Sequence, residues 1–116
     1  MRYSVILRKK KFGGRVAVFV HKSEDAQAIT IQITESFRVG DHSDFRKAYE
    51  SETGENLSFT IDLTSAQYMD SAALGMLLAM REHFVGESAS IRIVGCSASL
   101  RSILRIARFD QLFSVE

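Results

Sequence analysis

The residues best suited to chemistry lie in one short stretch, YMDSAALGML, from Tyr68 to Leu77. Within it an aspartate and a serine, Asp70 and Ser71, stand directly before a long apolar run. A serine in such a place can be a nucleophile, a helix cap, or an acceptor for a phosphoryl group. A serine hydrolase needs a neighbouring base and glycines that flank the nucleophile, and DSAAL lacks these glycines. We therefore expect that Ser71 performs no catalysis and that the protein is not an enzyme.

Other kinds of site have weak support in the sequence. The three histidines, His21, His42 and His83, do not have the spacing of metal ligands, so we expect no metal site. Cys96 is the only cysteine, which excludes an intramolecular disulfide, and its place at the end of IRIVGC predicts a buried or half-buried structural thiol. The segments FGGRV and TGEN do not match a phosphate-binding loop. We expect no cofactor.

The composition limits the class of partner. The chain has 116 residues, 46% of them hydrophobic, and a formal net charge of +1. These values match one globular domain, and a nearly neutral domain is a poor fit to nucleic-acid binding. The basic run from Arg8 to Lys11 is typical of a solvated tail. Neither a signal peptide nor an apolar span of about 18 residues is present, so we expect a cytoplasmic protein without membrane insertion.

Hydrophobic periodicity indicates the elements that precede Ser71. Two alternating runs, VAVFVHK and ITIQIT, predict an antiparallel β-hairpin. The segment HSDFRKAYE then has the spacing of a short helix, which Asp41 or Ser43 could cap. A further alternating run, LSFTIDL, predicts a strand that ends at Asp62 and Thr64.

A helix from about Ser71 to Phe84 follows this strand. After it come the strand IRIVGC and a last helix from about Ser99 to Arg108, which Ser97 or Ser99 could cap, with room for an extra short strand at either end of the chain. The predicted order is β-β-α-β-α-β-α. This order predicts an α/β fold in which helices pack on a mixed sheet of four to five strands.

The helix that begins at Ser71 has two distinct faces. One arc of a 3.6-residue repeat should face the sheet, with Leu74 at its edge: Ala73, Leu77, Met80 and Phe84. The opposite arc is made of small or polar residues with mostly apolar neighbours: Ser71, Gly75, Ala79 and Glu82, flanked by Ala72, Met76, Leu78 and His83. Solvent-facing helix surfaces are normally charged, so this second face is expected to contact another part of the chain or a partner.

Asp70 and Ser71 are both able to cap this helix. Either side chain can accept a hydrogen bond from the N–H groups of the first turn, and one cap is sufficient. If Asp70 is the cap, the Ser71 hydroxyl lies free in the first turn. A phosphate there would meet the positive helix end, which could hold its charge without melting the helix.

The stretch FTIDLT followed by YMDSAALGMLL resembles the signature of STAS domains, specifically of bacterial anti-sigma factor antagonists. The similarity extends from about Val16 to Val115. It implies that Ser71 is phosphorylated by an anti-sigma factor that is also a serine kinase, and that a phosphatase reverses this change. It further implies that the unmodified protein binds the anti-sigma factor, whereas the phosphorylated protein is released.

The sequence departs from the family pattern at two places. Ala73 stands where the family commonly has glycine, which leaves the acceptor serine intact. Phe37 and Arg38 stand where many members have an acidic turn that often contacts the kinase, so this departure concerns the identity of the partner. On this reading residues 1–14 are an N-terminal extension and residues 15–116 are the STAS domain. The expected partner-binding residues surround the modified serine and this turn: Asp70, Ser71, Ala72, Gly75, Met76, Ala79, Phe37 and Arg38.

A second reading stays open. In a STAS accessory subunit of an ABC-type lipid transport complex, the same helix face would be a permanent interface and Ser71 only a cap. The sequence leaves the oligomeric state open as well.

Overall fold

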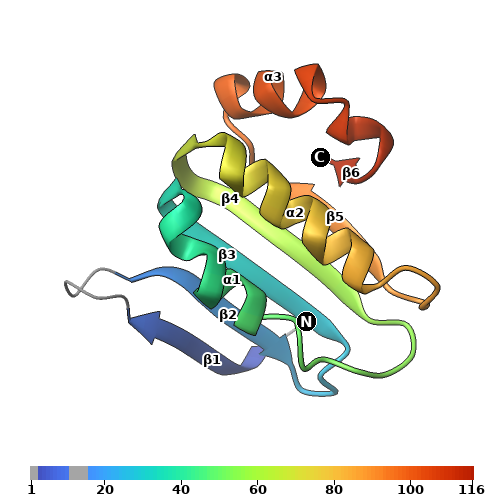
Figure 1. The fold of residues 1–116 in the computed structure, drawn as a ribbon. Helices are drawn as coiled ribbons and strands as arrows, with labels where there is room; N and C mark the ends of the chain where they lie inside the picture. Colours follow the sequence, from blue (N-terminus) through green and yellow to red (C-terminus); the bar gives the residue numbers. More distant parts are fainter. Residues whose placement is uncertain (1–2, 11–15) are drawn as a thin grey trace.

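The computed structural model describes residues 3–10 and 16–116. This part of the chain contains six strands, three helices and two short 3-10 turns (Figure 1). In chain order the elements are β1 (Tyr3–Lys10), β2 (Val16–Ser23), β3 (Ala28–Phe37), η1 (Val39–Asp41), α1 (His42–Lys47), β4 (Ser58–Met69), α2 (Ser71–His83), β5 (Ser90–Val94), α3 (Ala98–Ile106), η2 (Phe109–Gln111) and β6 (Ser114–Val115).

The strands form one mixed sheet in the order β1-β2-β3-β4-β5-β6. The pairs β1–β2 and β2–β3 are antiparallel, while β3–β4, β4–β5 and β5–β6 are parallel. Helices connect the parallel strands β3, β4 and β5, as crossover connections require. The predicted α/β fold with a mixed sheet is confirmed, although the sheet has six strands instead of the expected four to five.

The strand at the N-terminus, β1, has eight residues and is longer than the short extra strand for which the sequence left room. It pairs antiparallel with β2, from Tyr3 opposite Ser23 to Lys10 opposite Val16. It lies within residues 1–14, the predicted N-terminal extension, so that segment contributes an edge strand to the sheet. The basic run predicted as a solvated tail enters this strand, and four consecutive basic residues hide the alternation that marks a strand. Residues 1–2 and 11–15, which include the rest of the predicted tail and its two glycines, lie outside the described residues.

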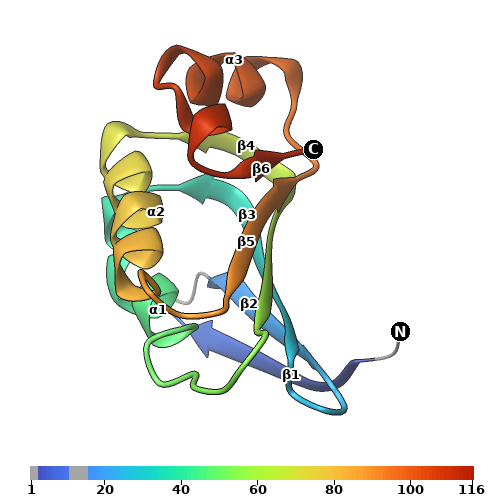
Figure 2. The same ribbon diagram turned by 90° about the vertical axis from the view of Figure 1, so that its right-hand side faces the viewer.

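The hydrophobic core lies between one face of the sheet and the helices. Figure 2 shows α1 and α2 on the same side of the strands. In the first half of each central strand, buried and half-buried residues alternate, so every second side chain turns toward the helices. Further along, where the pairing of the two strands shifts register, the buried residues are three or four positions apart. The buried residues of these two strands are Ile29, Ile31, Ile33, Phe37, Phe59, Ile61, Leu63, Ala66 and Met69.

β4 continues beyond its predicted end and carries the chain directly to Ser71. Asp62 and Thr64 do not stop the strand, because an Asp62 carboxylate oxygen accepts a hydrogen bond from the Thr64 N–H at 2.9 Å. At this point the pairing with β3 shifts register between Gln32 and Thr34. Such an irregularity bends a strand without ending it. The strand therefore runs on to Met69, next to the first turn of α2.

α1 is shorter than predicted and follows a 3-10 turn, η1. Asp41 stands at its N-cap position but makes no side-chain cap; its carboxylate accepts a hydrogen bond from the Arg38 N–H at 2.9 Å. The Asp41 side chain is fully buried. Asp41 therefore stabilises the turn between β3 and α1, and the expectation that Asp41 or Ser43 caps the helix is wrong.

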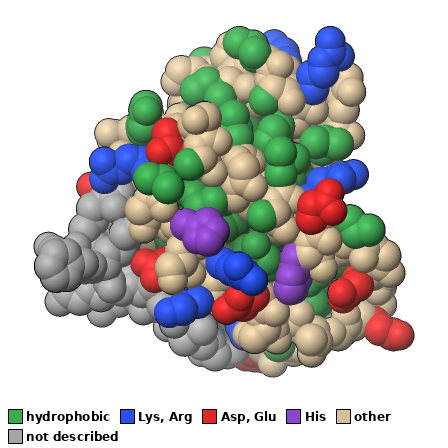
Figure 3. Space-filling view, in the orientation of Figure 1, with side chains coloured by type: hydrophobic (Ala, Val, Ile, Leu, Met, Phe, Trp, Pro, Cys, Tyr) green, Lys and Arg blue, Asp and Glu red, His purple; other side chains and the backbone are tan. Residues whose placement is uncertain are grey.

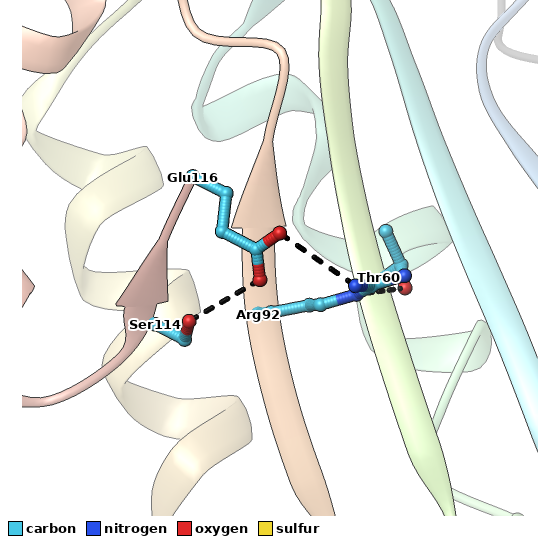
Figure 4. A network of polar contacts seen from close by, with 4 residues as sticks. All are labelled: Thr60, Arg92, Ser114 and Glu116. Carbon is cyan, nitrogen blue, oxygen red and sulfur yellow. Dashed lines mark hydrogen bonds and ion pairs between the residues drawn. The ribbon is translucent and has the colours of Figure 1, made fainter.

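The C-terminal elements are fixed to the far edge of the sheet. Ser97 caps α3, since its hydroxyl oxygen accepts a hydrogen bond from the Leu100 N–H at 3.2 Å, as one of the two predicted caps. Across the strands, the Arg92 Nε donates to Thr60 Oγ1 at 3.1 Å, and an Arg92 guanidinium nitrogen lies 3.7 Å from a Glu116 carboxylate oxygen. Figure 4 shows this network, in which the Ser114 hydroxyl donates to the Glu116 carboxylate. These contacts connect β4, β5 and β6.

Candidate functional site

The first turn of α2 is held by Asp70. One carboxylate oxygen, Oδ1, accepts a hydrogen bond from the Ala73 N–H at 2.9 Å, which makes Asp70 the N-cap. The other oxygen, Oδ2, accepts from the Val39 N–H at 3.1 Å, and the Asp70 N–H donates to the Phe37 carbonyl at 3.1 Å. A single aspartate thus joins the start of α2 to the turn after β3.

Ser71 is not needed to cap α2. It is the first residue of α2 and is exposed, and no described residue hydrogen-bonds to its hydroxyl. The sequence left open whether Asp70 or Ser71 caps the helix, and the structure shows Asp70 as the cap. The first turn of α2 contains no acidic residue, so the positive end of the helix faces the Ser71 side chain without a competing negative charge beyond Asp70.

The two predicted faces of α2 are largely confirmed. The four residues expected to face the sheet, Ala73, Leu77, Met80 and Phe84, are buried. On the opposite face Ser71, Gly75, Leu78, Ala79, Glu82 and His83 are exposed, while Ala72 is half-buried. Figure 3 shows hydrophobic side chains gathered on this side of the molecule over α2. No other element of the described part of the chain covers this face of α2. We name its exposed residues, Ser71, Gly75, Leu78, Ala79, Glu82 and His83, the α2 outer face.

Two expected partner-binding residues cannot serve in that role. The Phe37 side chain is fully buried and packs in the core against Phe45, with the rings tilted and their centroids 5.0 Å apart. Met76 is only 5% exposed, because α1 packs beside α2 and covers it. Their inclusion was wrong, since a turn position and a helix arc do not reveal what a neighbouring helix covers. Arg38 is exposed, as expected.

Val39 belongs to the same surface and was missed. It is 66% exposed, and its N–H donates a hydrogen bond to the Asp70 carboxylate. The signal was a lone valine in the polar turn SFRVGD, which did not stand out because single exposed apolar residues are common. The structure brings Arg38 and Val39 from one turn next to the start of α2.

A groove lies between α1 and α2, beside the α2 outer face. It encloses about 320 Å³. Three buried side chains and five exposed ones line it: Phe45, Tyr49 and Met76, and His42, Arg46, Ala79, Glu82 and His83. Burial raises the pKa of the Tyr49 phenol. Neither His42 nor His83 hydrogen-bonds to Ser71, so the described residues do not supply Ser71 with a base.

Cys96 is half-buried, in agreement with the prediction of a structural thiol. Burial raises the pKa of this thiol, and the nearby Arg101 lowers it by less. The dominant effect keeps the sulfur protonated and therefore a weak nucleophile. In the described part of the chain, no three acidic, histidine or cysteine side chains come together as a metal site would require. The described helices include none that is long and apolar enough to cross a membrane.

Two features define the class to which this domain belongs. One is the mixed sheet, and the other is the aspartate–serine pair at the start of a helix that follows a parallel strand. Residues 20–114 match the model of the family described as "Mlab, STAS domain". The chain belongs to the STAS domain family. β1 lies outside the matched residues.

Comparison with known proteins agrees with this assignment. The chain is 45% identical over 100 residues to a STAS-domain containing protein of Pseudomonas aeruginosa (strain UCBPP-PA14), which covers 86% of this chain and 99% of the relative. Among solved structures it is similar to a putative anti-sigma factor antagonist from Thermotoga maritima, with a TM-score of 0.71 and 11% identity over 83% of this chain and 82% of the other.

A second solved structure of similar fold is that of a sulfate transporter family protein from Wolinella succinogenes. Its TM-score is 0.66, with 14% identity over 74% of this chain and 70% of the other. At such low identities the two structures establish a shared fold and nothing beyond it.

The role of Asp70 can be tested by substitution. We expect Asp70→Ala to lower the free energy of unfolding by about 1–2 kcal/mol, because the Val39 N–H loses its acceptor and the Ala73 N–H keeps only the Asp70 backbone carbonyl, at 3.1 Å. Asp70→Asn keeps one acceptor oxygen for the cap and should cost less than about 1 kcal/mol. Amide hydrogen exchange measured by NMR should accelerate at Val39 in both variants. Unchanged exchange at Val39 would contradict the bridging role.

Proposed function

We propose that this protein is an anti-sigma factor antagonist whose binding state is set by phosphorylation of Ser71. The observation that carries the proposal is the division of roles between neighbours: Asp70 caps α2, and the Ser71 hydroxyl is exposed and unbonded among the described residues. A serine needed only to begin the helix would be redundant here, because Asp70 already fills that position.

A phosphoryl group on Ser71 would change the surface more than the fold. It adds about 1.5 to 2 negative charges at neutral pH, and the helix start can hold them through its positive end and free N–H groups. The same charges would lie on the α2 outer face, where Gly75 and Ala79 are exposed one and two turns further along the helix. A partner that packs an apolar or acidic surface there would be repelled.

Gly75 gives independent support for a partner on this face. A glycine inside a helix is less favourable than alanine by about 0.8–1 kcal/mol. A Cβ added at Gly75 would meet nothing within 4 Å, so packing within the described chain does not require glycine there. We infer that the absent side chain permits the close approach of another protein.

This inference leads to a prediction for Gly75→Ala. The substitution should raise the free energy of unfolding by about 0.5–1 kcal/mol, because it improves helix propensity in open space. The same substitution should weaken partner binding, because the methyl group stands on the α2 outer face. Chemical denaturation and a binding titration on the same sample test both effects. A variant that is more stable and binds as well as the wild type would contradict the inference.

The proposed partners follow from this switch. An anti-sigma factor with serine kinase activity would bind the unmodified α2 outer face and phosphorylate Ser71, and a phosphatase would restore the unmodified form. The protein is then a substrate with no catalytic role, and we place it in the cytoplasm with these partners. The test is affinity purification with mass spectrometry on Ser71→Ala and Ser71→Asp baits. Enrichment of an anti-sigma factor by the first bait alone supports the proposal.

The second candidate is a permanent subunit of a transport complex, such as a lipid-transporting ABC system. It is favoured by the family model named for MlaB and by the fold shared with a sulfate transporter family protein. In that role the α2 outer face would stay bound regardless of Ser71. Recovery of the same transport ATPase by both baits would support this candidate against the first.

A further inference from the structure

We propose that α3 carries a second docking surface, which binds an acidic segment of a protein partner independently of Ser71. The surface consists of Arg101, Arg105 and Arg108 with the apolar side chain of Ile106, and we name it the α3 arginine patch. It does not rest on the proposed switch, because α3 and α2 present different surfaces (Figures 1 and 2).

The three arginines fall within the eight residues from Arg101 to Arg108. Arg101 and Arg105 are one helical turn apart, and Arg108 follows the end of α3. Like charges at this spacing repel each other and slightly destabilise a helix. None of the three forms an ion pair within the part of the chain that the structure describes. The arrangement therefore has a cost in the isolated chain that an opposite charge from outside would remove.

Ile106 adds an apolar anchor to this charge. It is 82% exposed, more than any other large hydrophobic residue among those described. The helix itself is held by Leu100 and Leu104, which are buried, so Ile106 is not needed to attach α3 to the core. Ile106 directly follows Arg105 in the chain, and arginine is enriched at protein interfaces.

A small hollow forms part of the α3 arginine patch. It encloses about 200 Å³ and is lined by Arg101, Arg105, Leu104, Val115 and Asp110. Two guanidinium groups beside an apolar floor suit a carboxylate side chain on a short aliphatic stem, because arginine binds carboxylates in a bidentate manner. Asp110 makes the hollow less suited to a free anion than to a longer segment that also contacts Ile106.

The charge of α3 and of the segment before it favours an acidic protein segment as the occupant. Residues 16–96 contain twelve acidic side chains against six basic ones, while residues 1–15, at the other end of the chain, contain six basic and no acidic ones. α3 and the turn after it contain three arginines and one aspartate. Figure 3 shows basic side chains projecting at the top of the molecule, over α3. A bilayer or a nucleic acid would meet the acidic surface as well, while a single protein segment can lie along α3 alone.

The probe for this proposal is a fluorescein-labelled peptide of repeating Leu-Glu-Glu, and its control is the neutral Leu-Gln-Gln peptide. We expect the acidic peptide to bind in a salt-dependent manner and to shift NMR amide signals mainly in α3. The double variant Arg105→Glu/Ile106→Ser should weaken binding by about tenfold or more. The matched control is Lys47→Glu, which makes the same charge change in the last turn of α1 and should leave affinity within about twofold.

Ser71→Asp should also leave the affinity for this peptide unchanged, which separates the test from the proposed switch. The inference is overturned if Lys47→Glu weakens binding as much as the double variant, or if the neutral peptide binds equally well. It is also overturned if anionic lipid vesicles or single-stranded DNA bind α3 more tightly than the acidic peptide.

Discussion

Ser71→Asp is expected to weaken binding of the proposed anti-sigma factor partner by at least about tenfold, a loss of ~1.4 kcal/mol or more. The aspartate places a negative charge at the first residue of α2, on the face where Gly75 and Ala79 are exposed. The fold should tolerate it, because acidic residues are favourable in the first turn of a helix. Titration calorimetry with the purified partner measures the loss directly.

Ser71→Ala is the matched variant for this experiment. It removes a hydroxyl that makes no hydrogen bond with the described residues, so stability and partner affinity should both stay close to the wild type. It should also bind constitutively in the presence of the kinase. If Ser71→Asp and Ser71→Ala bind the partner equally well, Ser71 is not the switch and a permanent interface becomes the better account.

The largest expected effect on stability comes from Gly95, at the end of β5. Its φ of +76° is unfavourable for any residue with a Cβ. An added Cβ would also collide with the Thr64 Oγ1 and would lie 2.9 Å from the Thr64 backbone nitrogen. We expect Gly95→Ala to lower the free energy of unfolding by about 3 kcal/mol or more, which corresponds to about 10 °C in the melting temperature.

Gly86→Ala is the control for this prediction. Gly86 has a similar φ of +84°, but an added Cβ there would meet nothing within 4 Å. Its cost should therefore be only the backbone term of about 1–2 kcal/mol. Calorimetric melting of both variants separates strain from collision. Equal losses of stability would show that the close approach of Gly95 to Thr64 contributes nothing.

The parts of the fold that were predicted correctly are those in which local pattern and tertiary packing agree. The β2–β3 hairpin follows from strict alternation, and α2 follows from a 3.6-residue repeat with Asp70 before it. The sequence predicted that one of the two capping residues in tandem would be left unused, and the structure shows that this residue is Ser71. For these elements the periodic signal is long enough to determine one solution.

The parts that were missed depend on contacts between distant segments. β1 forms a strand of eight residues because β2 offers it an edge, and the three basic residues at its end, Arg8 to Lys10, carry no signal of that. β4 passes Asp62 because the side chain satisfies a backbone amide at a register shift. Phe37 is buried because α1 folds back over the turn that was expected to be a partner surface. None of these contacts is encoded in the local pattern.

The most direct test of the central claim is the intact mass of the protein isolated from its native cells, with fragmentation to locate any modification. The switch predicts a fraction that is heavier by one phosphoryl group, carried on Ser71 and absent from the Ser71→Ala variant. A protein that is entirely unmodified under conditions in which its kinase is present, or a phosphoryl group that persists in Ser71→Ala, would contradict it.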